Sequence, residues 1–213
     1  MEQRQTIDDV INGLSGDLQP VAVMGHPLSR ALPSAILCAL YVLFVSVAIG
    51  FRDDITSKLV EPLFVTEIIL SLAIAFSASV TSAWLCVPDM RGQRWLLAVP
   101  VALFAGMSVI YMQMTFAQGF EFVHLEWQSC VYQGFYMIGL PLLAVLVMSR
   151  KGRTTHPFWM SLNNTLSVGM MGWVGLRFTC GADSVDHIFT YHFFPFVVVG
   201  FLLLLFARCI YRW

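Results

Sequence analysis

The chain has 213 residues, of which 58% are hydrophobic and only 12% are charged. Soluble domains carry about 25% charged residues, so this composition predicts a multi-pass membrane protein and excludes an ordinary soluble domain. The formal net charge of −1 gives no sign of a basic surface, so direct binding of nucleic acid is not expected.

Residues 1–30 form a polar head, and residues 31–213 form the predicted transmembrane part. Within the head, apolar residues recur at helical spacing, which predicts a short amphipathic helix. Its apolar stripe consists of Ile7, Val10, Ile11, Leu14 and Leu18. The opposite face carries Asp9 and Asp17 but no cation, so attraction to anionic lipid is not expected. Two interpretations stay open: the helix binds a groove of a cytoplasmic protein, or it lies on its own bundle.

Six apolar runs follow the head, each long enough to cross a hydrocarbon core of about 30 Å as a helix. We expect spans at Leu32–Phe51, Phe64–Val87, Trp95–Met114, Cys130–Ser149, Phe158–Thr179 and Thr190–Cys209. The predicted fold is an all-α membrane protein. It has six transmembrane helices surrounded by membrane lipid, and a short cytoplasmic N-terminal amphipathic helix.

The cations orient the spans, because cytoplasmic loops are enriched in Lys and Arg. With six spans, most of the twelve cations fall on one side: Arg4, Arg30, Arg91, Arg94, Arg150, Lys151, Arg153, Arg208 and Arg212. The exceptions, on the opposite side or at its interface, are Arg52, Lys58 and Arg177. This bias predicts a bacterial inner-membrane protein with both termini in the cytoplasm.

Few polar residues lie within the predicted spans. Glu67 lies near the outer end of the second span, where we expect its carboxylate to reach water. Asn163 and Asn164 lie in the inner half of the fifth span and are expected to bond across helices. The same span contains a small-residue stripe for close helix packing, formed by Gly169, Gly172 and Gly175.

Two of the five cysteines are predicted to face each other. Cys130 and Cys180 are equally far along the chain from Thr155, which is the centre of the loop between the fourth and fifth spans. An antiparallel helix pair therefore brings both thiols to the same depth on the outer side. Helix axes about 8–10 Å apart allow the Cα separation of about 4.4–6.8 Å that a disulfide requires.

Three chemistries stay open for this pair. The thiols can form a permanent structural disulfide in an oxidising periplasm, or a reversible disulfide that acts as a switch. They can also hold zinc or copper, because two thiolates with one or two imidazoles suit these ions. The histidines predicted on the same side are His124, His187 and His192. Catalysis by a thiol oxidoreductase is not expected, since no C-x-x-C pair occurs, and no other cofactor is expected.

Several of these features occur together in one known family. They are the head segment DVINGLSGDLQPV at residues 9–21, six spans of about this total length, the single cysteines Cys130 and Cys180, and the closing Arg212-Trp213. On these features the chain resembles the NrsF-type anti-sigma factors, the negative regulators of sigma F.

The resemblance implies a regulator that is not an enzyme. The cytoplasmic head would hold an extracytoplasmic-function sigma factor at the inner membrane, and the outer cysteines, Cys130 and Cys180, would register oxidative or metal stress. The implied sigma-factor-binding residues are Ile7, Asp9, Val10, Ile11, Leu14, Asp17 and Leu18. A small membrane transporter or thiol-redox protein is the alternative function, and a sigma-factor gene beside this one would separate the two.

Overall fold

The computed structural model describes residues 7–16, 25–87, 93–118, 129–152 and 154–212, and every regular element in these ranges is a helix. The elements are α1 (Ile7–Gly16), α2 (Pro27–Ile49), α3 (Ile55–Lys58), α4 (Pro62–Leu85), the 3-10 helix η1 (Arg94–Leu97), α5 (Ala98–Gln118), α6 (Ser129–Arg150), α7 (Pro157–Thr179), α8 (Val185–His187), the π-helix η2 (Ile188–Phe193), α9 (Phe194–Leu205) and α10 (Ala207–Ile210). The predicted all-α class is confirmed.

Each of the six predicted spans falls on a long helical segment, but two of these segments begin earlier than predicted. α2 begins at Pro27 and not at Leu32, and the last segment begins at Val185 and not at Thr190. Proline suits the first turn of a helix because its φ is already helical and its missing N–H has no partner there. Hydropathy locates the apolar part of a helix and misses such starts.

Five segments are long and apolar enough to cross a membrane: Pro27–Ile49, Pro62–Leu85, Arg94–Ala117, Ser129–Arg150 and Val185–Leu205. The sequence predicts six, and the segment absent from the five is α7, although it has 23 residues. α7 contacts α2, α4, α6 and α9, and most of its residues are buried. Since few of its side chains can face lipid, α7 does not need the apolar composition of a peripheral helix.

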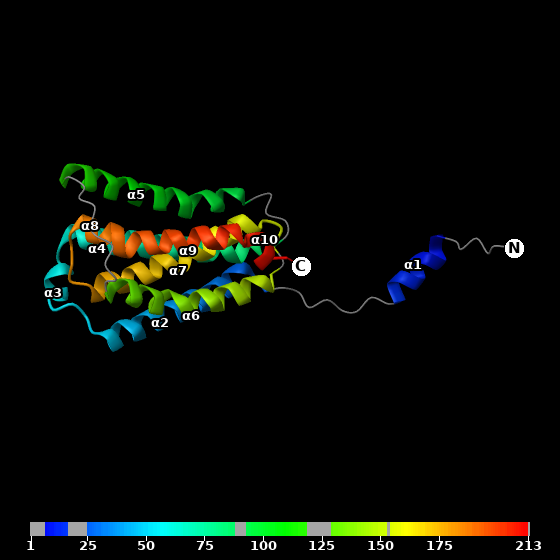
Figure 1. Ribbon diagram of the computed structural model, residues 1–213. Coiled ribbons are helices and arrows are strands. Elements are labelled where there is room, and N and C mark those ends of the chain that lie inside the picture. Colours follow the sequence, from blue (N-terminus) through cyan, green and yellow to red (C-terminus); the bar gives the residue numbers. More distant parts are fainter. Residues whose placement is uncertain (1–6, 17–24, 88–92, 119–128, 153, 213) are drawn as a thin grey trace.

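α7 lies at the centre of the bundle, between the other long helices (Figure 1). At Gly175, an added Cβ would lie 2.6 Å from Met137 Sδ of α6 and 2.6 Å from Val42 Cγ1 of α2, so only glycine fits without a shift. Gly172 is crowded in the same way. The predicted glycine stripe is wrong at Gly169, where an added Cβ would meet no heavy atom within 4 Å.

α1 lies apart from the bundle, and none of its residues is buried (Figure 1). The apolar side chains of its stripe are exposed, with Ile7 at 79% and Leu14 at 68%. Asp9 lies in the first turn, where the helix dipole favours an anion. Two members of the predicted head site, Asp17 and Leu18, lie outside the described residues.

Candidate functional site

Cys130 and Cys180 meet at one end of the bundle, named here the Cys130 end. Cys130 is in the first turn of α6, and Cys180 directly follows α7. Their Sγ atoms are 3.1 Å apart, both residues are buried, and the two thiols are not bonded to each other. The α6–α7 hairpin therefore holds two thiols in contact, one from each helix.

Two histidines lie against this thiol pair. The Nε2 atom of His187 is 3.4 Å from the Sγ atom of Cys180, and the His187 and His192 ring centroids are 5.3 Å apart. One ligand atom from each of the four side chains lies within 4.8 Å of all the others. The third predicted histidine, His124, lies outside the described residues.

The π-helix η2 explains how two histidines five residues apart reach one site. In an α-helix, five residues advance by about 500°, which leaves the two side chains about 140° apart around the axis. In a π-helix, hydrogen bonds join residues five apart, so these residues lie almost one above the other. The π-turn therefore brings His192 toward the thiols on the same side as His187.

The surroundings of Cys180 favour its thiolate. The hydrogen bond from the Cys130 thiol, together with the contacts to His187 and His192, lowers the pKa of Cys180. The thiolate is the form that attacks oxidants and binds metal ions. The pair is therefore arranged for thiolate chemistry at Cys180.

A network of ion pairs surrounds the segment that follows Cys180. The Asp183 carboxylate accepts hydrogen bonds from Arg52 at 2.8 and 2.9 Å and from Arg177 at 3.0 Å, and it lies 2.9 Å from Lys58 Nζ. Arg52 belongs to the segment after α2, Lys58 to α3 and Arg177 to α7. One carboxylate thus joins three segments of the bundle.

Glu67 extends this network into α4. Its carboxylate lies 2.9 Å from Arg177 Nε and accepts a hydrogen bond of 2.8 Å from Trp173 Nε1. The side chain is only 9% exposed. The prediction that Glu67 reaches water is wrong, because a cation and an indole N–H from α7 satisfy the carboxylate inside the protein.

The network fixes the Cys180 segment to the segment after α2. The backbone N–H of Arg52 donates to the carbonyl of Phe178 at 2.9 Å, and Arg52 Nη2 donates to the carbonyl of Gly181 at 3.4 Å. These two carbonyls flank Cys180, so the position of its thiol depends on Arg52.

Sequence reasoning did not find this network. Its members come from segments up to 131 residues apart, and no local spacing connects them. One signal was available: Arg52, Lys58 and Arg177 are the three cations that depart from the orientation bias, and acidic residues accompany them on that side. A cation on the side that has few cations is a candidate for an ion pair with a carboxylate.

The opposite end of the bundle, named here the Arg150 end, contains a buried polar cluster. Asn164 Nδ2 donates to Ser149 Oγ at 2.8 Å and to the Tyr211 hydroxyl at 2.7 Å. Asn164 therefore bonds across helices as predicted, joining α7 to α6 and to the residue after α10. The prediction is wrong for Asn163, whose amide donates to Trp159 O in its own helix.

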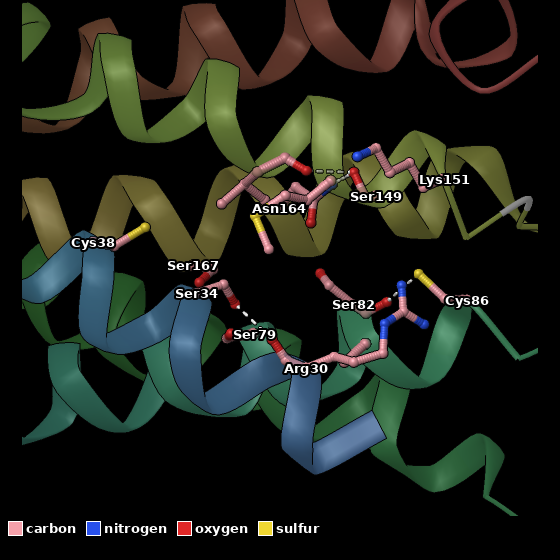
Figure 2. Close-up of a pocket in the computed structure, with 13 residues that line it drawn as sticks. Arg30, Ser34, Cys38, Ser79, Ser82, Cys86, Ser149, Lys151, Asn164 and Ser167 are labelled. Atoms are coloured by element: carbon pink, nitrogen blue, oxygen red, sulfur yellow. Dashed lines mark hydrogen bonds between the residues drawn. The ribbon is translucent and has the colours of Figure 1, made fainter. Parts of the chain in front are cut away.

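A cavity of about 260 Å³ lies beside this cluster, between α2, α4, α6 and α7 (Figure 2). Arg30 and Lys151 line it, together with five hydroxyl groups: Ser34, Ser79, Ser82, Ser149 and Ser167. No acidic residue of the described chain lines it. The charged groups of the lining are thus both cations, and Arg30 belongs to the first turns of α2.

Comparison with known proteins identifies a family. The family model NrsF, described as negative regulator of sigma F, matches residues 14–213. No curated protein and no solved structure matches the chain.

Proposed function

The chain belongs to the NrsF family of negative regulators of sigma F, and from this premise we propose that it holds an extracytoplasmic-function sigma factor at the bacterial inner membrane. The sigma factor binds α1 and is released when Cys130 and Cys180 respond to oxidative or metal stress. The family supports a regulatory role without catalysis.

The contact between the Cys130 and Cys180 thiols carries the proposal. Their Sγ atoms are 3.1 Å apart but come from different segments, so a bond between them would join α6 directly to the segment after α7. A peroxide takes two electrons and two protons from the two thiols, the S–S bond forms, and the peroxide is reduced to water or an alcohol and water. A small movement of the helix ends completes this reaction.

The six-span arrangement with cytoplasmic termini belongs to the same proposal. α7 has the length of a span and becomes the sixth, packed against four of the five apolar segments. The Arg150 end then faces the cytoplasm, since Arg30, Arg150, Lys151 and Arg208 lie there. The thiols face the periplasm, where oxidants are not removed by cytosolic thiols.

The exposed stripe of α1 supports its role as the binding element. An amphipathic helix places residues such as Ile7, Val10, Ile11 and Leu14 into an apolar groove of its partner. The face without cations disfavours a membrane surface as the alternative partner. We assign Asp9, Asp17 and Leu18 to the same contact from the sequence.

The two ends of the bundle communicate through α6 and α7. These helices run from the thiol pair to the Asn164 cluster and the cavity of Figure 2, which Arg30 of α2 lines. A shift of α6 along α7 alters that cavity and thereby the position of the head. A hundredfold release of the sigma factor requires about 2.8 kcal/mol of differential affinity between the two thiol states.

The proposal is tested in cells that carry a sigma-F-dependent reporter. Cys130→Ser, Cys180→Ser and the double variant should each hold the sigma factor and ignore oxidant, because each change removes the same bond and coupled sites are not additive. Cys209→Ser is the control, since Cys209 is a free cysteine at the Arg150 end that does not line the cavity of Figure 2. Alkylation of the denatured protein, with a metal chelator present, should find Cys130 and Cys180 as reactive thiols at rest and protected after oxidant.

Two results would contradict the proposal. Normal induction in both single variants would remove the thiol pair from sensing. Protection from alkylation before any stress would assign the pair to a permanent structural disulfide.

A further inference from the structure

Four metal-ligating side chains from three parts of the chain meet at the Cys130 end. Cys130 comes from α6, Cys180 from the segment after α7, and the two histidines from α8 and η2. We propose that a single zinc ion binds the four side chains Cys130, Cys180, His187 and His192.

The distances fit a tetrahedral zinc site. Zinc bonds of about 2.3 Å to sulfur and about 2.0–2.1 Å to nitrogen place neighbouring ligand atoms about 3.3–3.8 Å apart. The Cys130 and Cys180 sulfurs are 3.1 Å apart, the Cys180 sulfur is 3.4 Å from His187 Nε2, and all four ligand atoms lie within 4.8 Å of one another. Side-chain shifts of about 1 Å bring the four ligand atoms to this geometry.

His192 provides an independent observation. The side chain is fully buried, and within the described residues neither ring nitrogen makes a well-formed hydrogen bond, although the ring lies against the Cys180 thiol. A buried polar group that is poorly paired destabilises a fold, so an ion that binds both this ring and the thiolates would stabilise the position. The imidazole packs edge-to-face with Trp173 and with His187, and one of its nitrogens lies within 4.8 Å of both thiol sulfurs.

The ligand set suits zinc and excludes ions that require oxygen ligands. Two thiolates with two imidazoles in a tetrahedral arrangement are typical of zinc, whereas calcium and magnesium require oxygen ligands. On binding, the two thiols release two protons, and the divalent ion with two thiolates forms a neutral unit. A neutral unit suits this site, because Cys130, Cys180 and His192 are all buried.

The inference deepens the proposed function and rests on it only for the consequence of zinc loss. With zinc bound, α6, the Cys180 segment and η2 are held together at rest. A peroxide then oxidises the two zinc thiolates to a disulfide, takes up two protons as it is reduced, and releases the zinc ion. The oxidant signal thus replaces the four bonds to zinc with one S–S bond between Cys130 and Cys180.

The test uses the reduced full-length protein, purified in detergent micelles, with Co²⁺ as a spectroscopic probe for zinc. Metal analysis should find one zinc ion per chain. Cobalt should give a thiolate charge-transfer band and intense visible bands of a four-coordinate ion, and zinc should abolish both. His187→Asn and His192→Asn should each weaken zinc binding at least about tenfold. The matched control His156→Asn, a histidine before α7 at the Arg150 end, should bind as wild type.

The outcomes separate this inference from the proposed function. If reduced wild-type protein gives no thiolate charge-transfer band with excess cobalt, or if both His variants bind zinc as tightly as wild type, the zinc site does not exist. If His192→Asn does not fold, the half-buried His187 still provides the test. Zinc binding without capture of a sigma factor would overturn only the proposed function, and oxidant-controlled capture by a protein that never binds zinc would overturn only the zinc site.

Discussion

Asp183 is the residue on which the Cys130 end depends most. Its single carboxylate contacts Arg52, Lys58 and Arg177, and the first two are more than 120 residues from Asp183 along the chain (183 − 58 = 125). Removal of one carboxylate therefore leaves three cations with fewer partners. The cost is greatest for the two arginines, whose side chains are almost fully buried.

Asp183→Asn tests this role. We expect the free energy of unfolding to fall by about 1–2 kcal/mol. Breaking a fully buried ion pair costs about 3–5 kcal/mol, and the cost is smaller here because the Asp183 side chain is 34% exposed. The measurement is the melting temperature of the reduced protein in micelles. The control is Asp53→Asn, which changes an exposed carboxylate that follows Arg52 but lies outside the network. An equal loss of stability in Asp53→Asn would contradict the role of Asp183.

The same carboxylate gives the protein a defined dependence on acid. The hydrogen bonds from Arg52, with those from Lys58 and Arg177, hold the pKa of Asp183 below its ordinary value. Because the folded pKa lies below the unfolded one, the carboxylate stabilises the fold above its ordinary pKa of about 3.9, and this contribution is lost as the pH falls through the folded pKa. Melting temperatures should therefore fall below about pH 4, and less so in Asp183→Asn. Parallel curves for the two proteins would exclude Asp183 as the titrating group.

At the scale of elements, α7 is the helix that the others pack around, and its glycines set the distances. Gly175 allows α7 to approach both α2 and α6, while Gly169 faces open space. The two glycines therefore allow one substitution to be compared in two environments of the same helix.

Gly175→Ala should destabilise the bundle by about 1–3 kcal/mol, because the new methyl group overlaps Met137 and Val42. Gly169→Ala should be neutral or slightly stabilising, since alanine favours a helix by about 1 kcal/mol over glycine. Thermal unfolding of both variants in micelles checks the difference. Equal effects at the two positions would mean that α7 is not packed as closely as described.

The other element with a defined task is α1, and Leu14→Asp tests its stripe. A charge in the centre of an apolar contact should weaken sigma-factor capture at least about thirtyfold, because a buried anchor contributes about 2 kcal/mol or more. Membrane insertion should be unchanged. Asn12→Asp adds the same charge about 140° from Ile7 around the helix and should bind as wild type. Pull-down of the sigma factor decides, and full capture by Leu14→Asp would remove α1 from the interface.

At the scale of the whole molecule, the sequence predicted every long helix and the meeting of Cys130 with Cys180. Both predictions rest on geometry that varies little between membrane proteins: the number of residues in a span, and the equal depth of residues equally far from the turn of a helical hairpin. Neither requires knowledge of side-chain packing. Asn164 was predicted for a similar reason, because a buried amide in a membrane helix requires a partner.

What the sequence did not predict depends on packing in three dimensions. The burial of Glu67 follows from Arg177 and Trp173 on a different helix, and hydropathy does not report which helices are neighbours. The contribution of His192 depends on a π-turn, since α-helical spacing would turn it away from His187. Neither feature has a local sequence signal.

Whether the two termini lie on the same side of the membrane depends on the number of spans, and that number depends on whether α7 crosses the membrane. Five spans would place the two ends of the chain on opposite sides of the membrane, whereas six place them on the same side. The polar composition of α7 follows from its enclosure by other helices, so we expect it to span the membrane.

Reporter fusions after residue 212 and within residues 154–156 should therefore be cytoplasmic, and one within residues 181–184 periplasmic. The cations of the Arg150 end should retain this orientation, and Arg150→Glu with Lys151→Glu should weaken it. A periplasmic reporter after residue 212, with one before residue 27 in the cytoplasm, would mean that α7 lies within the bundle without crossing the membrane.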